Sequence, residues 1–216
     1  MISTIITAGG SSSRFKNINK LLYQIKNHPI IYYTVKTFDE LDFIDEIIIP
    51  SNIDIIDELR EIFKNFLKVK IIPGGLNRQE SVYKGLKECT DCKYVIIHDG
   101  ARPFVKKDVI IRCLEKAKQT NAAIAAVKTV DTIKIVDENM QIISTPDRNI
   151  LWNAQTPQIF DFSTILRLHE KYKGQNFTDD SLLYEQEGLK TSIVESEYSN
   201  FKITTTDDLS KIKNCL

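Results

Sequence analysis

The sequence predicts an α/β fold in which a mostly parallel sheet is flanked by helices. Short runs rich in Ile and Val alternate with segments of helical period along most of the chain, which is typical of βαβ units. The apolar runs are continuous, as expected for strands that are buried on both faces. Ligands of such sheets bind outside the carboxyl ends of the strands, so the residues that follow each run are the candidates for a functional site.

The individual elements follow from these runs in chain order. The expected strands are residues 2–7, 46–51, 68–74, 93–100, 122–128, 189–196 and 200–204. The expected helices are residues 29–41, 54–67, 78–89, 106–119, 162–173, 179–188 and 206–214. No linker or change of composition divides the chain, so we expect a single domain over residues 1–216.

Residues 131–148 break the alternation. Two short β-like runs flank a polar Asp-Glu-Asn turn, and this arrangement predicts a β-hairpin. A lone two-stranded ribbon is marginally stable in water, so its apolar residues need a further surface to cover them. We therefore expect a projecting arm, at about residues 131–155, that packs on another subunit.

The charge balance excludes several classes of partner. Lys and Arg together number 29, as do Asp and Glu, so no net field steers the protein towards nucleic acid or a membrane surface. No apolar segment reaches the length of a membrane span, and the first residues lack the features of a signal peptide. We expect a cytoplasmic protein that binds anions through locally placed cations.

The four cysteines do not form a metal site. Only Cys89 and Cys92 form a C-x-x-C pair, while Cys113, Cys215 and the three histidines are scattered along the chain. Zinc would need a second close pair or histidines at ligand spacing. The cysteines are interpreted as reduced structural thiols.

The first candidate site is the loop TAGGSSSRFKNINK, residues 7–20. It matches neither the Walker A pattern nor the dinucleotide-binding fingerprint. Gly9 and Gly10 permit close backbone approach, and Arg14 and Lys20 can reach phosphate oxygens from different sides. A polyphosphate site and a solvated turn with two surface cations both explain the loop taken alone.

Two further glycine-containing segments follow expected strands. In HDGARP, Asp99 is placed to hold a divalent cation and Arg102 a second anion, although an ordinary turn has the same pattern. In GGLNRQESV, Arg78 and Ser81 lie near an expected helix start, where they contact a ligand or only cap the helix. Because the three loops follow strands of one sheet, we expect them to meet in one crevice.

Seven segments match one protein family in order and approximate spacing. They are TAGGSSSRF with Lys20, GGLNRQESVYKGL, YVIIHDGARPF, VDTIK, DRNILWNAQTPQ, FTDDSLLYEQEG and NFKITTTDDL. Together they resemble the 2-C-methyl-D-erythritol 4-phosphate cytidylyltransferase family. The resemblance implies a Rossmann-like, GT-A-like nucleotidyltransferase fold and a homodimer held partly by exchanged arms. It also implies that CTP and Mg2+, or another divalent cation, are used to make a CDP-linked sugar alcohol and pyrophosphate in non-mevalonate isoprenoid synthesis.

The resemblance also implies a role for each matching residue. The catalytic positions are Arg14, Lys20, Arg148 and Lys202. The CTP-binding positions are Thr7, Ala8, Gly9, Gly10, Gly75, Arg78, Ser81, Asp99 and Gly100, with Asp99 near Mg2+. The polyol-phosphate positions are Arg102, Thr132, Arg148, Thr156, Thr178 and Lys202. Arg148 is expected to reach the site of the neighbouring subunit.

Some alternatives remain open from the sequence. Lys16 rivals Lys20, because the spacing from Arg14 varies among relatives, and relatives often have Ala at Gly9 or Gly100. A ribitol-5-phosphate cytidylyltransferase, which makes CDP-ribitol, shares the nucleotide half of the site, although HDGARP and DTIK favour the isoprenoid enzyme. A dehydrogenase is disfavoured by the glycine spacing, and a nucleotide-binding protein without catalysis is distinguished by releasing no pyrophosphate.

Overall fold

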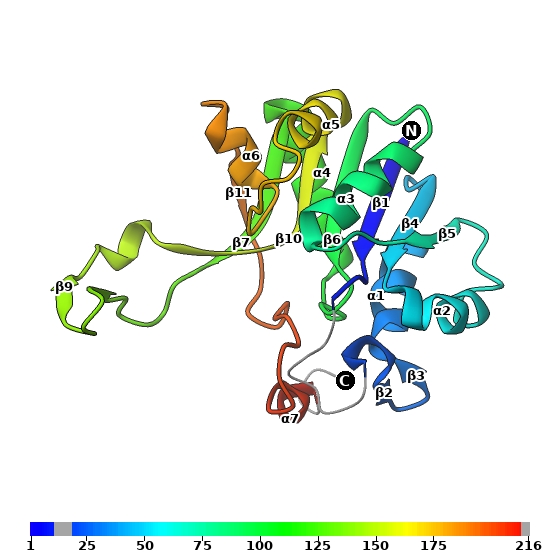
Figure 1. Ribbon diagram of the computed structural model, residues 1–216, viewed down its shortest axis with the longest axis horizontal. Coiled ribbons are helices and arrows are strands. Elements are labelled where there is room, and N and C mark those ends of the chain that lie inside the picture. Colours follow the sequence, from blue (N-terminus) through cyan, green and yellow to red (C-terminus); the bar gives the residue numbers. More distant parts are fainter. Residues whose placement is uncertain (11–18, 213–216) are drawn as a thin grey trace.

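The structure, a computed structural model, describes residues 1–10 and 19–212 (Figure 1). Within them, seven strands form one sheet in the order β11-β7-β10-β6-β1-β4-β5. These strands are β1 (Ile2–Thr7), β4 (Glu46–Ser51), β5 (Val69–Pro73), β6 (Tyr94–Asp99), β7 (Ala122–Lys128), β10 (Trp152–Asp161) and β11 (Ser192–Glu195). All neighbours pair in parallel except β10, which is antiparallel to β6 and β7. The mostly parallel sheet that the sequence predicts is confirmed.

Helices cover both faces of this sheet. They are α1 (Ile30–Asp39), α2 (Ile56–Ile62), α3 (Arg78–Glu88), α4 (Lys107–Thr120), α5 (Phe162–Lys171) and α6 (Ser181–Gln186). The short helix α7 (Asp208–Ile212) lies away from the sheet and packs in a separate small cluster (Figure 1). On one face Ile6 of β1 packs in a buried cluster with Phe38 of α1, and on the other Ile5 packs with Val82 of α3 and Leu168 of α5. Adjacent residues of β1 point to opposite faces, so its continuous apolar sequence fills both halves of the core. Among the described residues, every helix is too short or too polar to cross a bilayer.

The arm between β7 and β10 projects from the sheet (Figure 1). Its strands β8 (Ile135–Val136) and β9 (Ile142–Ser144) pair antiparallel, as the sequence predicts. The predicted end of the arm at about residue 155 is too late, because Trp152 already pairs with Lys128 of β7 in the main sheet. Ile142 and Ile143 are 63% and 65% exposed, so the single chain leaves the apolar side chains of this hairpin largely uncovered.

Two predictions about strands are wrong. Strand β10 is missing from the expected set, because its sequence contains polar residues and Pro157, and the strand register shifts between Ala154 and Gln158. Residues 200–204 are not a strand. Their alternating apolar residues instead pack in a small cluster, where Ile203 is buried and Phe201 lies against it. A short hairpin of β2 (Gln24–Ile25) and β3 (His28–Pro29) is also present.

Candidate functional site

A cavity of about 240 Å3 lies at the carboxyl ends of β1 and β6, beside the start of α3. It brings together nine of the residues predicted for the site, namely Thr7, Gly9, Gly10, Lys20, Arg78, Ser81, Asp99, Gly100 and Lys202. The convergence of the three loops that the sequence predicts is thus confirmed, and a lysine from the C-terminal segment joins them. Lys20 reaches the cavity from a short 3-10 helix, η1 (Lys20–Leu22), which Asn19 caps by accepting a hydrogen bond from the Leu21 amide.

The start of α3 is held by side chains of its own first turn. Asn77 caps the helix by accepting a hydrogen bond from the Glu80 amide at 2.8 Å. The Ser81 hydroxyl donates to the Asn77 carbonyl and accepts from the Gly75 amide, both at 2.9 Å. A Cβ on Gly75 would lie only 2.4 Å from the Glu80 side chain, so the loop passes close to the helix only because it has glycine there. These bonds place Arg78 at the edge of the cavity.

The loop after β6 lies directly against β1. The Gly100 amide donates to the Thr7 carbonyl at 3.1 Å, and a Cβ on Gly100 would lie 2.8 Å from the same oxygen. Thr34 of α1 donates its hydroxyl to the Gly100 carbonyl at 2.9 Å. The backbone beside Asp99 is therefore fixed from two elements.

Three cations surround the carboxylate of Asp99. One oxygen lies 3.0 Å from the Lys202 ammonium and 3.3 Å from Nε of Arg102, and the other lies 3.5 Å from Nε of Arg78. Burial by itself raises the pKa of Asp99, but Lys202, Arg78 and Arg102 outweigh it and hold the pKa well below its ordinary value. Asp99 is thus ionised and has three cationic partners, of which Arg78 also pairs with Asp180. Together with Lys20 in the same cavity, these cations suit a polyanionic ligand.

Arg78 has a second carboxylate partner that the sequence reasoning missed. Its Nη1 lies 2.7 Å from Oδ2 of Asp180, and Oδ1 of Asp180 accepts a hydrogen bond from Nε2 of His169 at 3.1 Å. Burial lowers the pKa of Arg78, yet Asp180 and then Asp99 raise it above its ordinary value. The segment FTDDSL is one of the seven matching segments, but the resemblance assigns a role only to its Thr178. Asp179 does cap α6 by accepting from the Leu182 amide, and the second acid, Asp180, is the partner of Arg78.

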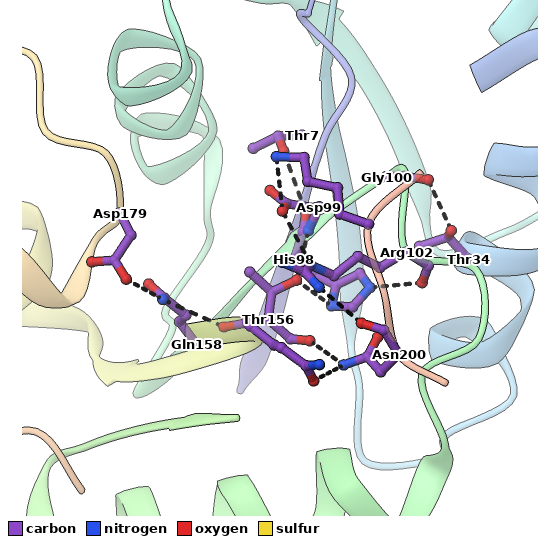
Figure 2. Close-up of polar contacts among 12 residues, drawn as sticks. Thr7, Thr34, His98, Asp99, Gly100, Arg102, Thr156, Gln158, Asp179 and Asn200 are labelled. Atoms are coloured by element: carbon purple, nitrogen blue, oxygen red, sulfur yellow. Dashed lines mark hydrogen bonds and ion pairs between the residues drawn. The ribbon is translucent and has the colours of Figure 1, made fainter. Parts of the chain in front are cut away.

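The buried side chain of His98 joins residues on the inner side of the cavity through hydrogen bonds (Figure 2). Nε2 of His98 donates to the Arg102 carbonyl at 3.2 Å, so Nδ1 accepts from the Thr156 hydroxyl at 3.0 Å. The Thr156 oxygen in turn accepts from the Asp99 amide at 3.0 Å. Burial lowers the pKa of His98 to about 4, so its ring is neutral in this network. His98 and Thr156 therefore position Asp99 and Arg102.

Asn200 attaches the C-terminal segment to β10 (Figure 2). Its amide nitrogen donates to the Thr156 carbonyl at 2.9 Å and to Oε1 of Gln155 at 3.0 Å. The backbone carbonyl of Asn200 accepts from Nη1 of Arg102 at 2.8 Å. This buried residue lies two positions before Lys202, and its bonds help to place the Lys202 ammonium beside Asp99. Asn200 and Gln155 lie in the segments NFKITTTDDL and DRNILWNAQTPQ, but the resemblance assigns neither residue a role.

The remaining predicted residues lie outside the cavity or outside the described chain. Arg14, together with its neighbour Lys16, falls among residues 11–18 and lies outside the described residues. Ala8 and Gly75 contribute to the backbone around the cavity, and Arg102 and Thr156 lie beneath it in the contacts above. The other three are exposed at a distance from it: Thr178 lines a separate cavity, and Thr132 and Arg148 belong to the arm. Nη1 of Arg148 donates to the Val130 carbonyl at 2.9 Å.

The cavity offers one carboxylate to a metal ion. Among the described residues, no cluster of three or more His, Cys, Asp or Glu side chains could hold a metal by itself. Asp99 is the acidic residue that lines the cavity. One carboxylate fits Mg2+, which is commonly held by one or two carboxylates, water and the phosphates of a substrate.

Known proteins are similar to this chain in sequence and in fold. The family profile described as "IspD: 2-C-methyl-D-erythritol 4-phosphate cytidylyltransferase" matches residues 2–216. The 2-C-methyl-D-erythritol 4-phosphate cytidylyltransferase of Caldanaerobacter subterraneus is 42% identical over 96% of this chain and 95% of its own length. A Clostridium botulinum protein of the same name is 45% identical over 96% and 93%. The crystal structure of 4-diphosphocytidyl-2C-methyl-D-erythritol synthase from Anaerococcus prevotii superposes with a TM-score of 0.88 at 34% identity, over 97% of this chain and 95% of that one.

Proposed function

Because the chain belongs to the 2-C-methyl-D-erythritol 4-phosphate cytidylyltransferase family, we propose that it joins CTP to 2-C-methyl-D-erythritol 4-phosphate. The products are 4-diphosphocytidyl-2-C-methyl-D-erythritol and pyrophosphate, and the reaction belongs to non-mevalonate isoprenoid synthesis. The cation-rich cavity around Asp99 is the observation that carries the proposal. It offers an anion-binding pocket at the strand ends, where ligands of such sheets bind.

The reaction needs charge neutralisation more than proton transfer. A phosphate monoester is largely dianionic at neutral pH because its second pKa is about 6, so an oxygen of the polyol phosphate can attack the α-phosphorus of CTP without a general base. The buried histidine His98 has both ring nitrogens engaged and is neutral, which agrees with a reaction that does not use it. Positioned cations stabilise the charge that develops on the phosphorus and on the leaving pyrophosphate.

We assign the nucleotide to the side of the cavity nearest β1 and α3. The backbone of Thr7, Ala8, Gly9 and Gly10, with Gly75, Arg78 and Ser81, binds the base and the triphosphate. Gly100 faces the ribose, and Arg14 and Lys20 stabilise the transition state at the α-phosphate. The shared cavity that Lys20 and Arg78 line supports this assignment.

Asp99 is the residue that would hold Mg2+ or another divalent cation. Its carboxylate is ionised, and its present partners are side chains that can turn to phosphate oxygens instead. When bound, the cation neutralises charge on the triphosphate.

The second substrate and the dimer are assigned together. Lys202 and Arg102 lie beside Asp99 and are assigned to the polyol phosphate, and Thr156 holds the backbone amide of Asp99 between them. Arg148 reaches the site of the neighbouring subunit when two chains exchange arms. Thr132 and Thr178 complete that half of the site. The exposed apolar side chains of the arm support a homodimer, because a partner's surface would cover them.

We also propose a single-domain enzyme that works in the cytoplasm, where its water-soluble substrates would be, and that uses neither nucleic acid nor a membrane. The test measures pyrophosphate release from CTP and Mg2+ with methylerythritol phosphate and ribitol 5-phosphate in parallel assays. We expect turnover with the first acceptor to exceed that with the second. Equal or faster use of ribitol phosphate would overturn the acceptor, and no release with either would overturn the enzyme.

A further inference from the structure

Two thiols lie together at the opposite end of α3 from the cavity. Cys89 follows the last residue of α3, and Cys92 lies two residues before β6. Arg78 begins the same helix eleven residues before Cys89, which places the thiols roughly 16 Å away along the helix axis. Neither cysteine has a part in the proposed reaction.

The loop geometry brings the two thiols into contact. Asp91 between them has a φ of 40°, in the left-handed region, and reverses the direction of the chain. The loop is held on both sides of this turn: Glu46 accepts from the Thr90 amide at 2.9 Å, and the Lys93 amide donates to the Met1 carbonyl at 2.9 Å. As a result the Cys89 and Cys92 thiols interact with each other and with Ser3 of β1.

The two sulfurs differ in their tendency to ionise. The hydrogen bond with Cys92 and then burial raise the pKa of Cys89, which also lies at the negative end of the α3 dipole. Interaction with the Cys89 thiol outweighs burial at Cys92 and lowers the pKa of that thiol to about 7. The Cys89 thiol donates to the Gly85 carbonyl at 3.4 Å, and the Cys92 thiol donates to the Tyr94 carbonyl at 2.8 Å. Because the end of the α3 dipole disfavours a thiolate at Cys89, Cys92 is the nucleophile of the pair.

The pair is accessible to a small oxidant. Both cysteines are only half-buried, and Cys92 lines an open depression of about 500 Å3 with Lys93 and Phe162. Cys113 is fully buried, and burial raises its pKa to about 12, so it is protected. Cys215 lies outside the described residues.

We propose that Cys89 and Cys92 form a redox-active pair that a hydroperoxide oxidises to an intramolecular disulfide. The Cys92 thiolate attacks one peroxide oxygen, the O–O bond breaks, and hydroxide or an alkoxide leaves, so that Cys92 becomes a sulfenic acid. The Cys89 sulfur then attacks the Cys92 sulfur. Its proton and the displaced hydroxide leave as water, and an S–S bond forms. Two electrons pass from the thiols to the peroxide, and a dithiol reductant later supplies two electrons that reduce the disulfide.

The test uses the full-length chain carrying Cys215→Ser, which removes disulfide exchange with that cysteine. The protein is treated with hydrogen peroxide, alkylated and digested with trypsin. Residues 88–93 form one tryptic peptide with both thiols, and residues 113–116 form another with Cys113. We expect the first peptide to lose two hydrogens at least tenfold faster than Cys113 is modified, and dithiothreitol to reverse the change. Equal rates for the two peptides would overturn the proposal.

Two matched variants separate the roles of the thiols. In Cys89→Ser, the sulfenic acid on Cys92 has no partner and should be trapped by dimedone. In Cys92→Ser, Cys89 should react with peroxide at least tenfold more slowly and give no comparable adduct. Trapping at Cys89 as fast as at Cys92, or direct conversion to sulfinic acid with no disulfide in the parent protein, would also overturn the proposal.

Discussion

The cavity and the arm both carry proposed site residues. In a single chain the polar groups around the cavity have partners, whereas the apolar side chains of the arm remain exposed. Around the cavity, Asp99 has three cationic partners, and the atoms beneath it form a continuous hydrogen-bond network. On the arm, Ile142 and Ile143 face solvent over most of their surface. The proposed nucleotide half of the site is therefore built mainly within one chain, whereas the arm has apolar surface that the proposed second chain would cover. Substitutions in the cavity should change chemistry and stability, and those on the arm should change acceptor binding and assembly.

The largest effect is expected at Lys20. In Lys20→Ala we expect kcat to fall about 100- to 1000-fold, because a positioned cation at the developing charge is lost, while the Kd for CTP changes less than about tenfold. Pyrophosphate release and calorimetry measure the two quantities. Lys16→Ala removes the same charge from the same loop and should stay within about threefold of the parent. The reverse ranking of the two variants would transfer the role to Lys16.

Acid should weaken the network beneath the cavity through His98. Its pKa is about 4 in the folded protein, against an ordinary value of about 6.5 in the unfolded chain, so between these values only the unfolded chain binds the proton. The contribution of neutral His98 to the free energy of unfolding is complete above pH 6.5, and about 3 kcal/mol of it is lost as the pH falls to 4. Urea unfolding at several pH values measures it. His98→Gln should unfold with a shallower pH dependence than the parent, and an unchanged slope would contradict the assignment.

An intermediate effect is expected at Arg148 on the arm. Arg148→Ala should raise the KM for the polyol phosphate about 30-fold, the loss of on the order of 2 kcal/mol from charge-assisted hydrogen bonds. The Kd for CTP should not change, because the proposed nucleotide site is the cavity of one chain. Lys134→Ala is the matched control, since its ammonium bonds Thr145 on the same arm. A large loss of CTP affinity in Arg148→Ala would contradict the assignment of the arm to the polyol phosphate and of the cavity to the nucleotide.

The smallest effect is expected for a single apolar residue of the arm. Ile143→Ser should weaken the proposed homodimer about tenfold, as part of the buried apolar area is lost. Sedimentation equilibrium across a dilution series measures the dimer constant. Leu67→Ser changes an even more exposed apolar residue on the body of the protein and should leave the constant unaltered. A chain that stays monomeric at all concentrations would show that the arm is covered in some other way.

Sequence patterns predicted the parallel part of the fold because each βα unit carries its own signal. They missed β10, because only its second half, from Gln158, is paired on both sides, by β6 and β7. Its first half pairs with β7 alone and leads into the arm, so its sequence is not uniformly apolar. They misassigned residues 200–204, where Phe201 and Ile203 alternate because of packing and not because of strand pairing.

The same division holds for the candidate site. The glycines and cations that follow strands were identified, because strand ends converge in a parallel sheet. Asp180, His169 and Asn200 were missed, because their roles depend on contacts between segments distant in sequence. The helix pattern around His169 is that of any amphipathic helix, and nothing local marks its bond to Asp180.

The arm leaves and re-enters the sheet at directly paired positions, Lys128 and Trp152. The chain between these two residues is thus a self-contained insertion, and its length can change without shifting the register of any strand. Changes in the arm therefore need not alter the body that holds the proposed nucleotide site. We expect that residues 129–151 can be replaced by a two-residue turn to give a compact unit, to which arms of other specificity could be attached.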